Sequence, residues 1–227
     1  MRLEPLGDSA VVATLGSRID SESLAPVLAL ARAVREAGAR GVVEVVPAYA
    51  TVTVFYDPLQ FANPDEDAYG IICGLIEACA ERAVGGDHAG RDFEIPVCYG
   101  GEFGPDLGHV AGHCRLDAEE VVALHCAGDY LVHAIGFTPG FPFLGGLPAP
   151  LATPRRDTPR ARVPAGSVGI GGSQTGVYPI ASPGGWHLIG RTPLALFLPE
   201  RSPASLLRPG DRVRFRRISQ AQFESWK

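Results

Sequence analysis

The N-terminal part of the chain shows two stretches in which apolar residues recur with the period of an amphipathic helix. Between residues 24 and 34 these residues fall on one helical face, and Gly38 follows as a natural stop. A second stripe covers residues 68–79, and the sequence Asn-Pro-Asp-Glu at 63–66 has the features of a helix start. The pattern therefore predicts two helices in this region.

Three shorter stretches are rich in β-branched residues, which is typical of strands. These stretches are residues 10–15, 41–47 and 51–56. In the last one the alternation places Val52, Val54 and Tyr56 on one face. The order strand, helix, strand, strand, helix suits a small α+β sandwich, in which two helices cover one face of an antiparallel sheet.

A polar, glycine-rich segment at residues 83–90 separates this pattern from a different one. We therefore expect an N-terminal α+β domain over residues 1–86 and a second domain over residues 91–227. The second domain begins with a strand and two short helices, and Asp117 with Glu120 three residues later predicts a capping box at the start of the second helix. Strands and turns dominate after Gly140. Short strands with glycine and proline corners favour a closed β-barrel over an open sheet.

The central part of this second domain is unusually rich in glycine and proline. Residues 136–192 contain 12 Gly and 9 Pro among 57 residues. These residues separate short apolar runs at 167–170, 177–180 and 186–189, which we expect to form strands, so the segment is no disordered linker. We interpret it as the lining of a site built on strands and tight turns.

Composition and charge argue against nucleic-acid-binding, membrane-spanning and secreted proteins. A net charge of −5 over 227 residues gives no electrostatic reason to bind nucleic acid or an anionic membrane. The longest apolar run is too short to span a bilayer, and the first residues lack the apolar run of a signal peptide. We therefore expect a cytoplasmic protein. The five cysteines show no CxxC spacing, so we expect buried thiols and no metal site.

Polar side chains within the glycine- and proline-rich segment are candidates for ligand binding. Gln174 and Thr175 lie between glycines, where we expect a turn; they could recognise an amide or carboxylate, or could stabilise the turn. His187 could act as an acid or base near neutral pH, or could be a hydrogen-bonded barrel residue. His133 lies in an apolar strand and has the same two interpretations.

Two further segments suggest contacts with a ligand or a partner. Four arginines occur between residues 153 and 162, between prolines; they suit binding of carboxylate, phosphate or an acidic partner, or else surface ion pairs. The segment FTPGFPFLGG places three phenylalanines on what we expect to be an exposed loop, to be covered by another polypeptide or a lid.

Three segments together resemble a known family. They are GFTPGFPFLGGL, ATPRRDTPRARVPAGSVGIGGSQTGVYPIASPGGWHLIGRT and LLRPGDRVRF, and they resemble the B-subunit family of 5-oxoprolinase, also called KipI or allophanate hydrolase subunit 1. The resemblance implies an α+β fold, with a small N-terminal α+β sandwich followed by a cyclophilin-like β-barrel. A barrel of this type does not by itself imply prolyl isomerase activity.

The resemblance also implies an activity that needs partners. It implies a hydrolase subunit that takes part in the ATP-dependent conversion of 5-oxo-L-proline to L-glutamate, with ATP and Mg used by the complex and the isolated chain inactive. The implied partners are a KipA or allophanate hydrolase subunit 2-like protein and a LamB/YcsF-type protein, the A subunit of the complex. Alternatives are a KipI-like inhibitor of a sensor histidine kinase and a carboxyltransferase-type subunit of a urea or allophanate pathway.

On this basis the candidate residues have the following roles. The catalytic candidates are His187 and Gln174. The substrate-binding candidates are Thr175, Tyr178, Arg156, Arg160, Arg162 and His133. The partner-interface candidates are Phe137, Phe141, Phe143 and Trp186, and we expect a cleft that a second polypeptide completes.

Overall fold

The computed structural model describes residues 1–17, 21–61, 66–83 and 90–226. The chain divides into two compact units, residues 1–89 and 90–227, and each is described by itself. None of the helices in these described ranges is long and apolar enough to cross a membrane.

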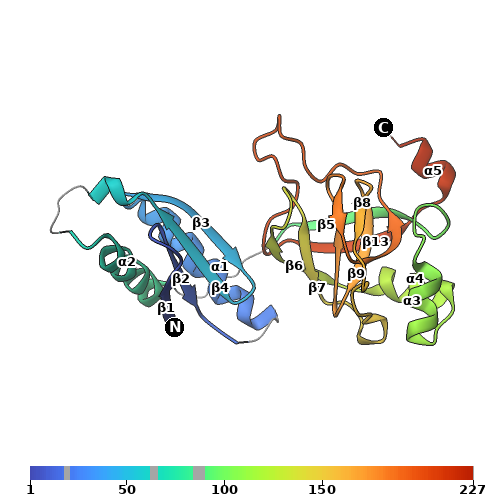
Figure 1. Ribbon diagram of the computed structural model, residues 1–227, viewed down its shortest axis with the longest axis horizontal. Coiled ribbons are helices and arrows are strands. Elements are labelled where there is room, and N and C mark those ends of the chain that lie inside the picture. The colour runs from blue at the N-terminus through green and yellow to red at the C-terminus, as the bar shows by residue number, and fades with distance from the viewer. Residues whose placement is uncertain (18–20, 62–65, 84–89, 227) are drawn as a thin grey trace. The chain divides into compact units, whose positions relative to one another are not determined.

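The first unit is an antiparallel sheet with helices packed on it (Figure 1). The sheet order is β1-β2-β4-β3. Its elements are β1 (Arg2–Pro5), β2 (Ala10–Thr14), α1 (Ser21–Ala37), β3 (Val42–Ala48), β4 (Thr51–Tyr56), η1 (Pro58–Phe61) and α2 (Ala68–Arg82). Val52, Val54 and Tyr56 are buried as the alternation predicts. The predicted α+β sandwich is therefore confirmed.

Two details of the first unit differ from the prediction. The sequence does not predict the short edge strand β1, because its residues RLEP include no β-branched side chain and end in proline, which is tolerated at a sheet edge. The helix start predicted at residues 63–66 is wrong for Glu66, the one of these residues that the structure describes. The helix α2 begins at Ala68, after the N-cap residue Asp67, so Glu66 lies before the helix. Residues 63–65 lie outside the described residues.

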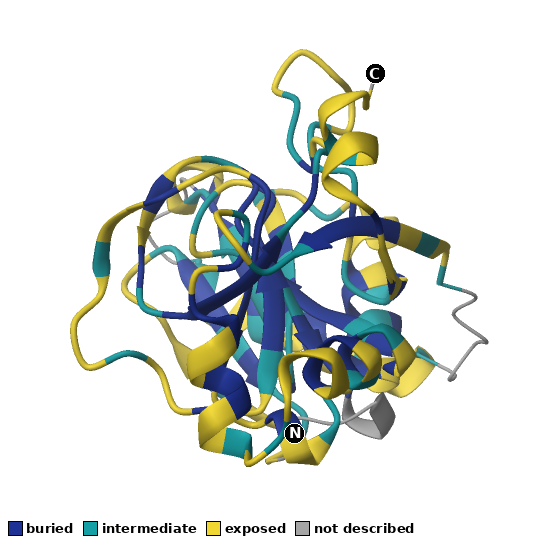
Figure 2. Ribbon diagram, turned by 90° about the vertical axis from the view of Figure 1, so that its right-hand side faces the viewer, coloured by how far each residue is buried: buried dark blue, intermediate teal, exposed yellow. Residues whose placement is uncertain are grey.

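The second unit is built around a barrel (Figures 1 and 2). Seven of the described strands close it in the order β10-β7-β6-β13-β5-β12-β9, in which β13 runs parallel to β5 and the other pairs are antiparallel. Its strands are β5 (Asp92–Tyr99), β6 (Tyr130–Ile135), β7 (Pro142–Gly145), β9 (Ser167–Gly171), β10 (Gln174–Val177), β12 (His187–Arg191) and β13 (Arg212–Arg217). The predicted barrel is confirmed.

The remaining elements of this unit lie around the barrel. Helices α3 and α4 share the barrel's main hydrophobic core, and a capping box between Asp117 and Glu120 begins α4 as predicted. Strands β8 and β11 form a separate two-stranded ribbon. The bounds are α3 (Leu107–Cys114), α4 (Ala118–Ala127), η2 (Ala149–Leu151), β8 (Arg160–Val163), β11 (Ser182–Gly184) and α5 (Gln220–Glu224).

The turn predicted around Gln174 and Thr175 is wrong. The turn lies at residues 172–173, with Gly172 at φ +66°, and residues 174–177 form β10 rather than the predicted strand at 177–180. Some glycines here are needed for space rather than for a turn. A Cβ on Gly171 would lie 2.6 Å from the Trp186 indole, and one on Gly176 would lie 2.9 Å from the Phe141 ring.

Inside the barrel, His125 of α4 joins strands that are not neighbours. Its Nδ1 lies 2.8 Å from the Tyr99 hydroxyl, and its Nε2 lies 3.0 Å from Thr175 Oγ1. Thr175 Oγ1 donates to the Gly169 carbonyl, so its oxygen is left to accept from His125 Nε2–H while Nδ1 accepts from Tyr99. This network requires a neutral imidazole, and burial lowers the pKa of His125 to about 3.

The buried neutral histidine makes the stability of the chain depend on pH. In the unfolded chain the pKa of His125 returns to about 6.5, so the unfolded state takes up a proton below that pH while the folded state does not. Stability is full above pH 6.5 and falls as the pH decreases towards 3. We expect roughly 2 kcal/mol of unfolding free energy to be lost through this residue between pH 7 and 5. Denaturant unfolding at both pH values measures it; a His125→Gln variant, although less stable at pH 7, should lose this part of the pH dependence. An unchanged pH dependence would contradict the assignment.

At the start of β13, the carboxylate of Asp211 fixes the parallel pairing with β5. The side chain is fully buried and accepts hydrogen bonds from Arg91 Nε at 3.1 Å and from the Arg208 backbone N–H at 2.9 Å. The Arg91 backbone N–H also donates to it at 3.3 Å. Because Arg91 precedes β5 directly, this one carboxylate sets the point at which both strands begin.

Removing this carboxylate should destabilise the barrel. We expect Asp211→Ala to lower the unfolding free energy by about 3 kcal/mol, because it leaves buried donors unpaired. Asp129→Ala is the matched control, since the ion pair of Asp129 with Arg214 is exposed and should contribute little. Thermal unfolding of both variants measures the difference, and equal midpoints would show that Asp211 has no special role.

Candidate functional site

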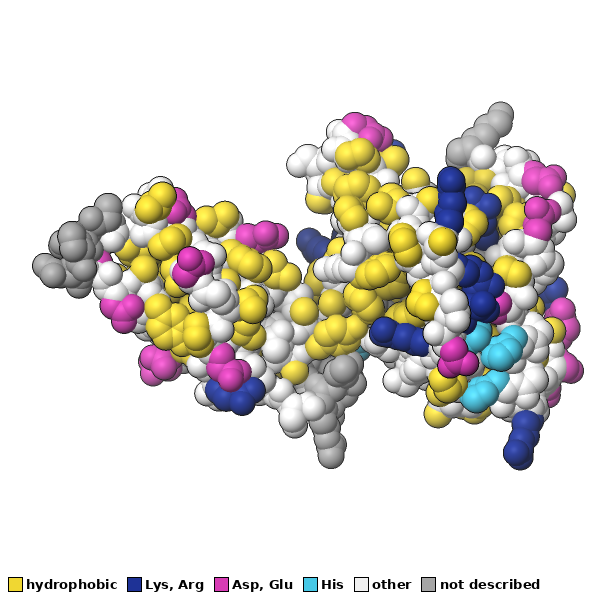
Figure 3. All heavy atoms as spheres, viewed as in Figure 1, with side chains coloured by type: hydrophobic (Ala, Val, Ile, Leu, Met, Phe, Trp, Pro, Cys, Tyr) yellow, Lys and Arg dark blue, Asp and Glu magenta, His cyan; other side chains and the backbone are white. Residues whose placement is uncertain are grey.

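Two hollows on the second unit lie on either side of the segment that carries Arg155 and Arg156. The first, which we call the histidine hollow, has a volume of about 390 Å³ and includes His109, His113 and His187 in its lining. The second, the aromatic hollow, has a volume of about 300 Å³ and is lined mainly by aromatic side chains and by the β8–β11 ribbon and its flanking residues. Both arginines line both hollows. Figure 3 shows histidine and basic side chains gathered next to one another on this unit.

The segment between the hollows is held in place by Asp106, at the N-terminus of α3. One carboxylate oxygen of Asp106 accepts from Arg160 Nη2 at 2.8 Å and from Arg156 Nη1 at 3.3 Å. The other accepts from the Leu188 backbone N–H at 2.7 Å, and the Asp106 N–H donates to the Leu188 carbonyl at 2.9 Å. One residue therefore joins α3, β12 and the arginine segment.

The charge of Asp106 is maintained by these partners. Burial by itself raises the pKa of its carboxyl group, but the hydrogen bonds from Arg160 and Leu188 and the positive charges of Arg160 and Arg156 outweigh it, and the pKa is lowered overall. A carboxylate with only 8% of its side chain exposed stays ionised because two guanidinium groups face it.

In the histidine hollow, the ring of His187 stacks on that of His109. The ring centroids are 4.4 Å apart and the planes differ by 14°. His187 is buried, whereas His109 and His113 are exposed on α3, one turn apart. Burial, followed by the positive charge that His109 can carry, lowers the pKa of His187. His187 is therefore neutral near pH 7 and can either donate or accept a proton.

The aromatic hollow is built from rings packed edge to face. Phe141 contacts Tyr178 at 5.1 Å, Trp186 at 5.5 Å and Phe143 at 4.9 Å between centroids. Phe141 is buried and Phe143 half-buried, so the prediction that three phenylalanines are exposed on a loop is wrong for these two. Only Phe137 of the three is exposed, at 63%. The two rings come together because Phe141 directly precedes β7 and Phe143 lies within it, and both pack edge to face against Trp186.

Of the catalytic candidates, the structure places His187 in the histidine hollow and Gln174 at the start of β10, half-buried. The substrate-binding candidates Tyr178 and Arg156 line the aromatic hollow. Thr175 lies inside the barrel, where its hydroxyl group is bonded to His125 and Gly169 and does not project from a turn.

The other candidates are dispersed. His133 is buried in β6, with its ring against Gly145. Arg160 lies on β8 and is paired with Asp106, and Arg162 is exposed two residues further on. All four interface candidates, by contrast, line the aromatic hollow: Phe137, Phe141, Phe143 and Trp186.

Sequence reasoning misses three residues of this region as site residues. Asp106 gives no signal, because its partners lie 50 to 82 residues away in the chain. Arg155 stands out only as part of the arginine run, although it lines both hollows and lies over the Trp186 ring. His109 could have been found, because its spacing of four residues from His113 within a predicted helix places the two on one face.

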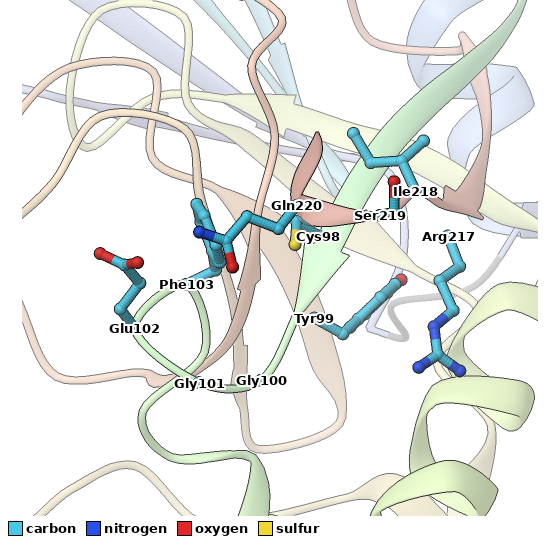
Figure 4. Close-up of a pocket in the computed structure, with 10 residues that line it drawn as sticks. All are labelled: Cys98, Tyr99, Gly100, Gly101, Glu102, Phe103, Arg217, Ile218, Ser219 and Gln220. Carbon is cyan, nitrogen blue, oxygen red and sulfur yellow. The ribbon is translucent and has the colours of Figure 1, made fainter. Parts of the chain in front are cut away.

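A third hollow, of about 510 Å³, lies at the end of β5 beside α5 (Figure 4). Its lining includes Glu102, Phe103 and Gln220 on one side and Arg217 apart from them. Arg217 is paired with Glu119, and Phe103 packs on Phe223. No group of three or more His, Cys, Asp or Glu side chains in the described ranges is placed to hold a metal ion.

The tether made by Asp106 can be tested by proteolysis. Trypsin cleaves after arginine, and the arginine segment contains several such bonds that Asp106 should hold closed. We expect Asp106→Asn to increase the rate of cleavage between residues 155 and 162 by about tenfold or more, because it removes charge-assisted hydrogen bonds. Asp157→Asn, an exposed substitution in the same segment, is the matched control. Equal cleavage rates in the two variants, measured by mass spectrometry, would contradict the tether.

The sequence and fold are similar to known proteins. A family model described as carboxyltransferase domain, subdomain C and D, matches residues 1–207. The B subunit of 5-oxoprolinase from Bacillus subtilis (strain 168) is 47% identical over 234 residues, covering 100% of this chain and 96% of that protein. The B subunit of 5-oxoprolinase from Escherichia coli O157:H7 is 48% identical over 210 residues, covering 92% of this chain and 93% of that protein.

Solved structures agree with the fold. The crystal structure of TTHA0988 is 40% identical with a TM-score of 0.79; the match covers 92% of this chain and 40% of that one. Urea carboxylase of Kluyveromyces lactis has a TM-score of 0.76 at 18% identity, covering 98% of this chain and 22% of that one, and shows the shared fold alone. With relatives this similar over nearly its whole length, the chain belongs to the B-subunit family of 5-oxoprolinase, within the family of carboxyltransferase subdomains C and D.

Proposed function

We propose that this chain is one subunit of an ATP-dependent 5-oxoprolinase, which converts 5-oxo-L-proline to L-glutamate. The observation that carries the proposal is the identity of 47% and 48%, over nearly the whole chain, to proteins named as the B subunit of 5-oxoprolinase. The candidate site is compatible with it, because 5-oxoproline is a small ring that bears one amide and one carboxylate.

The aromatic hollow suits such a ring. Its rings provide an apolar wall, and Arg155 and Arg156 at its edge can pair with the carboxylate. Arg156 is held by Asp106, whereas Arg155 is exposed and forms no ion pair within the described residues, so Arg155 is the better carboxylate ligand. Tyr178 and Trp186 would fix the plane of the ring.

The chemistry requires ATP with Mg at the level of the complex. In the proposed reaction the amide oxygen takes the γ-phosphoryl group of ATP, which releases ADP and makes the carbonyl carbon electrophilic. Water then attacks that carbon, the ring C–N bond breaks and the nitrogen takes up a proton, which leaves γ-glutamyl phosphate. A second water molecule hydrolyses this acyl phosphate to glutamate and inorganic phosphate. His187 is suited to accept a proton from the water, because its pKa is lowered and its ring is neutral near pH 7.

A partner protein would complete the site at Phe137. This side chain is 63% exposed beside the aromatic hollow and has a φ of +67°, a conformation that is costly for a bulky residue. An exposed aromatic residue in a strained conformation is typical of a contact residue. We propose that a KipA or allophanate hydrolase subunit 2-like protein covers it, and that the LamB/YcsF-type protein also takes part in the reaction. On this proposal the isolated chain is inactive.

The proposal can be tested by reconstitution. The full chain, mixed with the partner proteins, should consume ATP only when 5-oxoproline is present and should release glutamate in equal amount. Phe137→Ala should weaken assembly by roughly tenfold or more, because a central aromatic contact is lost, while the unfolding midpoint stays nearly constant. Chromatography and an ADP assay measure both effects.

Failure of the reconstitution would favour a different function. No ATP consumption with all partners present, together with tight binding to a sensor histidine kinase that Phe137→Ala weakens, would support the KipI-like inhibitor. The exposure of Phe137 is the observation that favours testing the inhibitor function, because an exposed aromatic side chain could contact either kind of partner.

A further inference from the structure

We propose that the histidine hollow is a binding site for a phosphoryl group, separate from the aromatic hollow that would hold the ring of the substrate. The inference rests on the proposed function, in which a phosphoryl group is transferred and then released as inorganic phosphate. It adds a location and named ligands to that reaction, and it can be tested on this chain without any partner.

Hydrogen-bond donors face the hollow from three elements. His109 and His113 come from one face of α3, and His187 begins β12. Arg155 and Arg156 come from the segment that precedes β8. Imidazole and guanidinium groups are the side chains that bind phosphate oxygens most readily, and donors from several directions fit a tetrahedral group with three or four oxygens better than a planar carboxylate.

The local charge favours an anion. Three arginines and two carboxylates lie in the lining of the hollow or are paired with it. Arg155, Arg156 and Asp157 line the hollow. Asp106 forms ion pairs with Arg156 and Arg160. Among these five side chains the arginines outnumber the carboxylates by one, in a chain whose net charge is −5. The carboxylate of Asp106 is already shared between Arg156 and Arg160, so Arg155 is the arginine of these three that does not pair with it. A guanidinium group has five N–H donors, so Arg155 can face phosphate in one hollow and the carboxylate of the substrate in the other.

His187 supplies an independent observation that points to a ligand. It is 95% buried, and its Nδ1 has no hydrogen-bond partner within the part of the chain that the structure describes. A buried ring nitrogen without a partner is unfavourable, so sites of this kind are usually completed by a water or a ligand. The exposed His109 ring stacks on His187, and both residues line the hollow.

The position beside the aromatic hollow agrees with this assignment. The two hollows share Arg155 and Arg156, so a ring held on one side and a phosphoryl group held on the other would face the same two guanidinium groups. Such an arrangement would bring the phosphoryl group close to the amide oxygen that it is transferred to.

The test uses the full chain and inorganic phosphate, followed by NMR of the imidazole C–H signals at constant ionic strength. We expect saturable shifts for His109, His113 and His187. The buried His125 lies inside the barrel and should not shift, which makes it an internal control. Acetate, added at the same ionic strength, should produce much weaker shifts. Mg-ATP in place of phosphate shows whether the hollow also accepts the phosphoryl group while it is part of the nucleotide.

Arg155→Ala should weaken phosphate binding by about tenfold or more, because a charge-assisted contact is lost. Arg201→Ala is the matched control, since it removes another exposed arginine of the same unit that lines neither hollow. His187→Gln, which keeps a hydrogen-bonding group, should weaken binding less than His187→Leu.

Three results would overturn the inference: no saturable shift with phosphate, equal shifts with acetate, or equal affinity in Arg155→Ala and Arg201→Ala. The result is separable from the proposed function. Phosphate binding in this chain without 5-oxoproline turnover by the complex would reject only the function, and turnover without phosphate binding here would reject only this inference.

Discussion

The candidate site depends on one buried carboxylate, that of Asp106. It binds the backbone of β12 and two arginines that are distant in sequence, and it keeps its charge because those arginines face it. Besides this ion pair, the segment between η2 and β8 is held by the β-bridge of Thr153 with Gly172 at its start and by the backbone hydrogen bond from Arg156 to Gly185. Both hollows have this segment as a common wall, so their shapes are set by the same interaction.

A second polar network lies inside the barrel, and its side chains bond to one another and not to the candidate site. Tyr99, His125 and Thr175 satisfy one another inside the barrel, and each has a defined donor or acceptor role. Burial of these groups is tolerated only when every one is bonded, so none of them can also serve a ligand. The barrel interior is thus a closed structural core, and the candidate site is formed by side chains outside it, including those of α3.

Much of the fold could be predicted from local sequence, because the signals that set it are local. The alternation in β4 and the capping box at Asp117 depend on residues two or three positions apart, and both are confirmed. The segment at Gln174 could not be predicted in this way. Its glycines suggest a turn, but Gly171 and Gly176 lie in strands. These strand positions require glycine because the rings of Trp186 and Phe141 occupy the space that a Cβ would need. That constraint comes from residues 15 and 35 positions away, which no local pattern reports. The candidate site could not be predicted for the same reason, since Asp106 is distant in sequence from Arg156 and Arg160 and contacts them only in the folded chain.

The rigid and the adjustable parts of the site are therefore different residues. The edge-to-face packing of Phe141, Tyr178 and Trp186 leaves these rings little freedom, and Asp106 immobilises Arg156. Phe137 and Arg155 line the same hollow but are exposed. A partner that covers Phe137 would also exclude water from Arg155, and an arginine–carboxylate pair gains strength as the surrounding dielectric constant falls. Assembly and substrate affinity would then be coupled through two neighbouring side chains, without any change in the barrel.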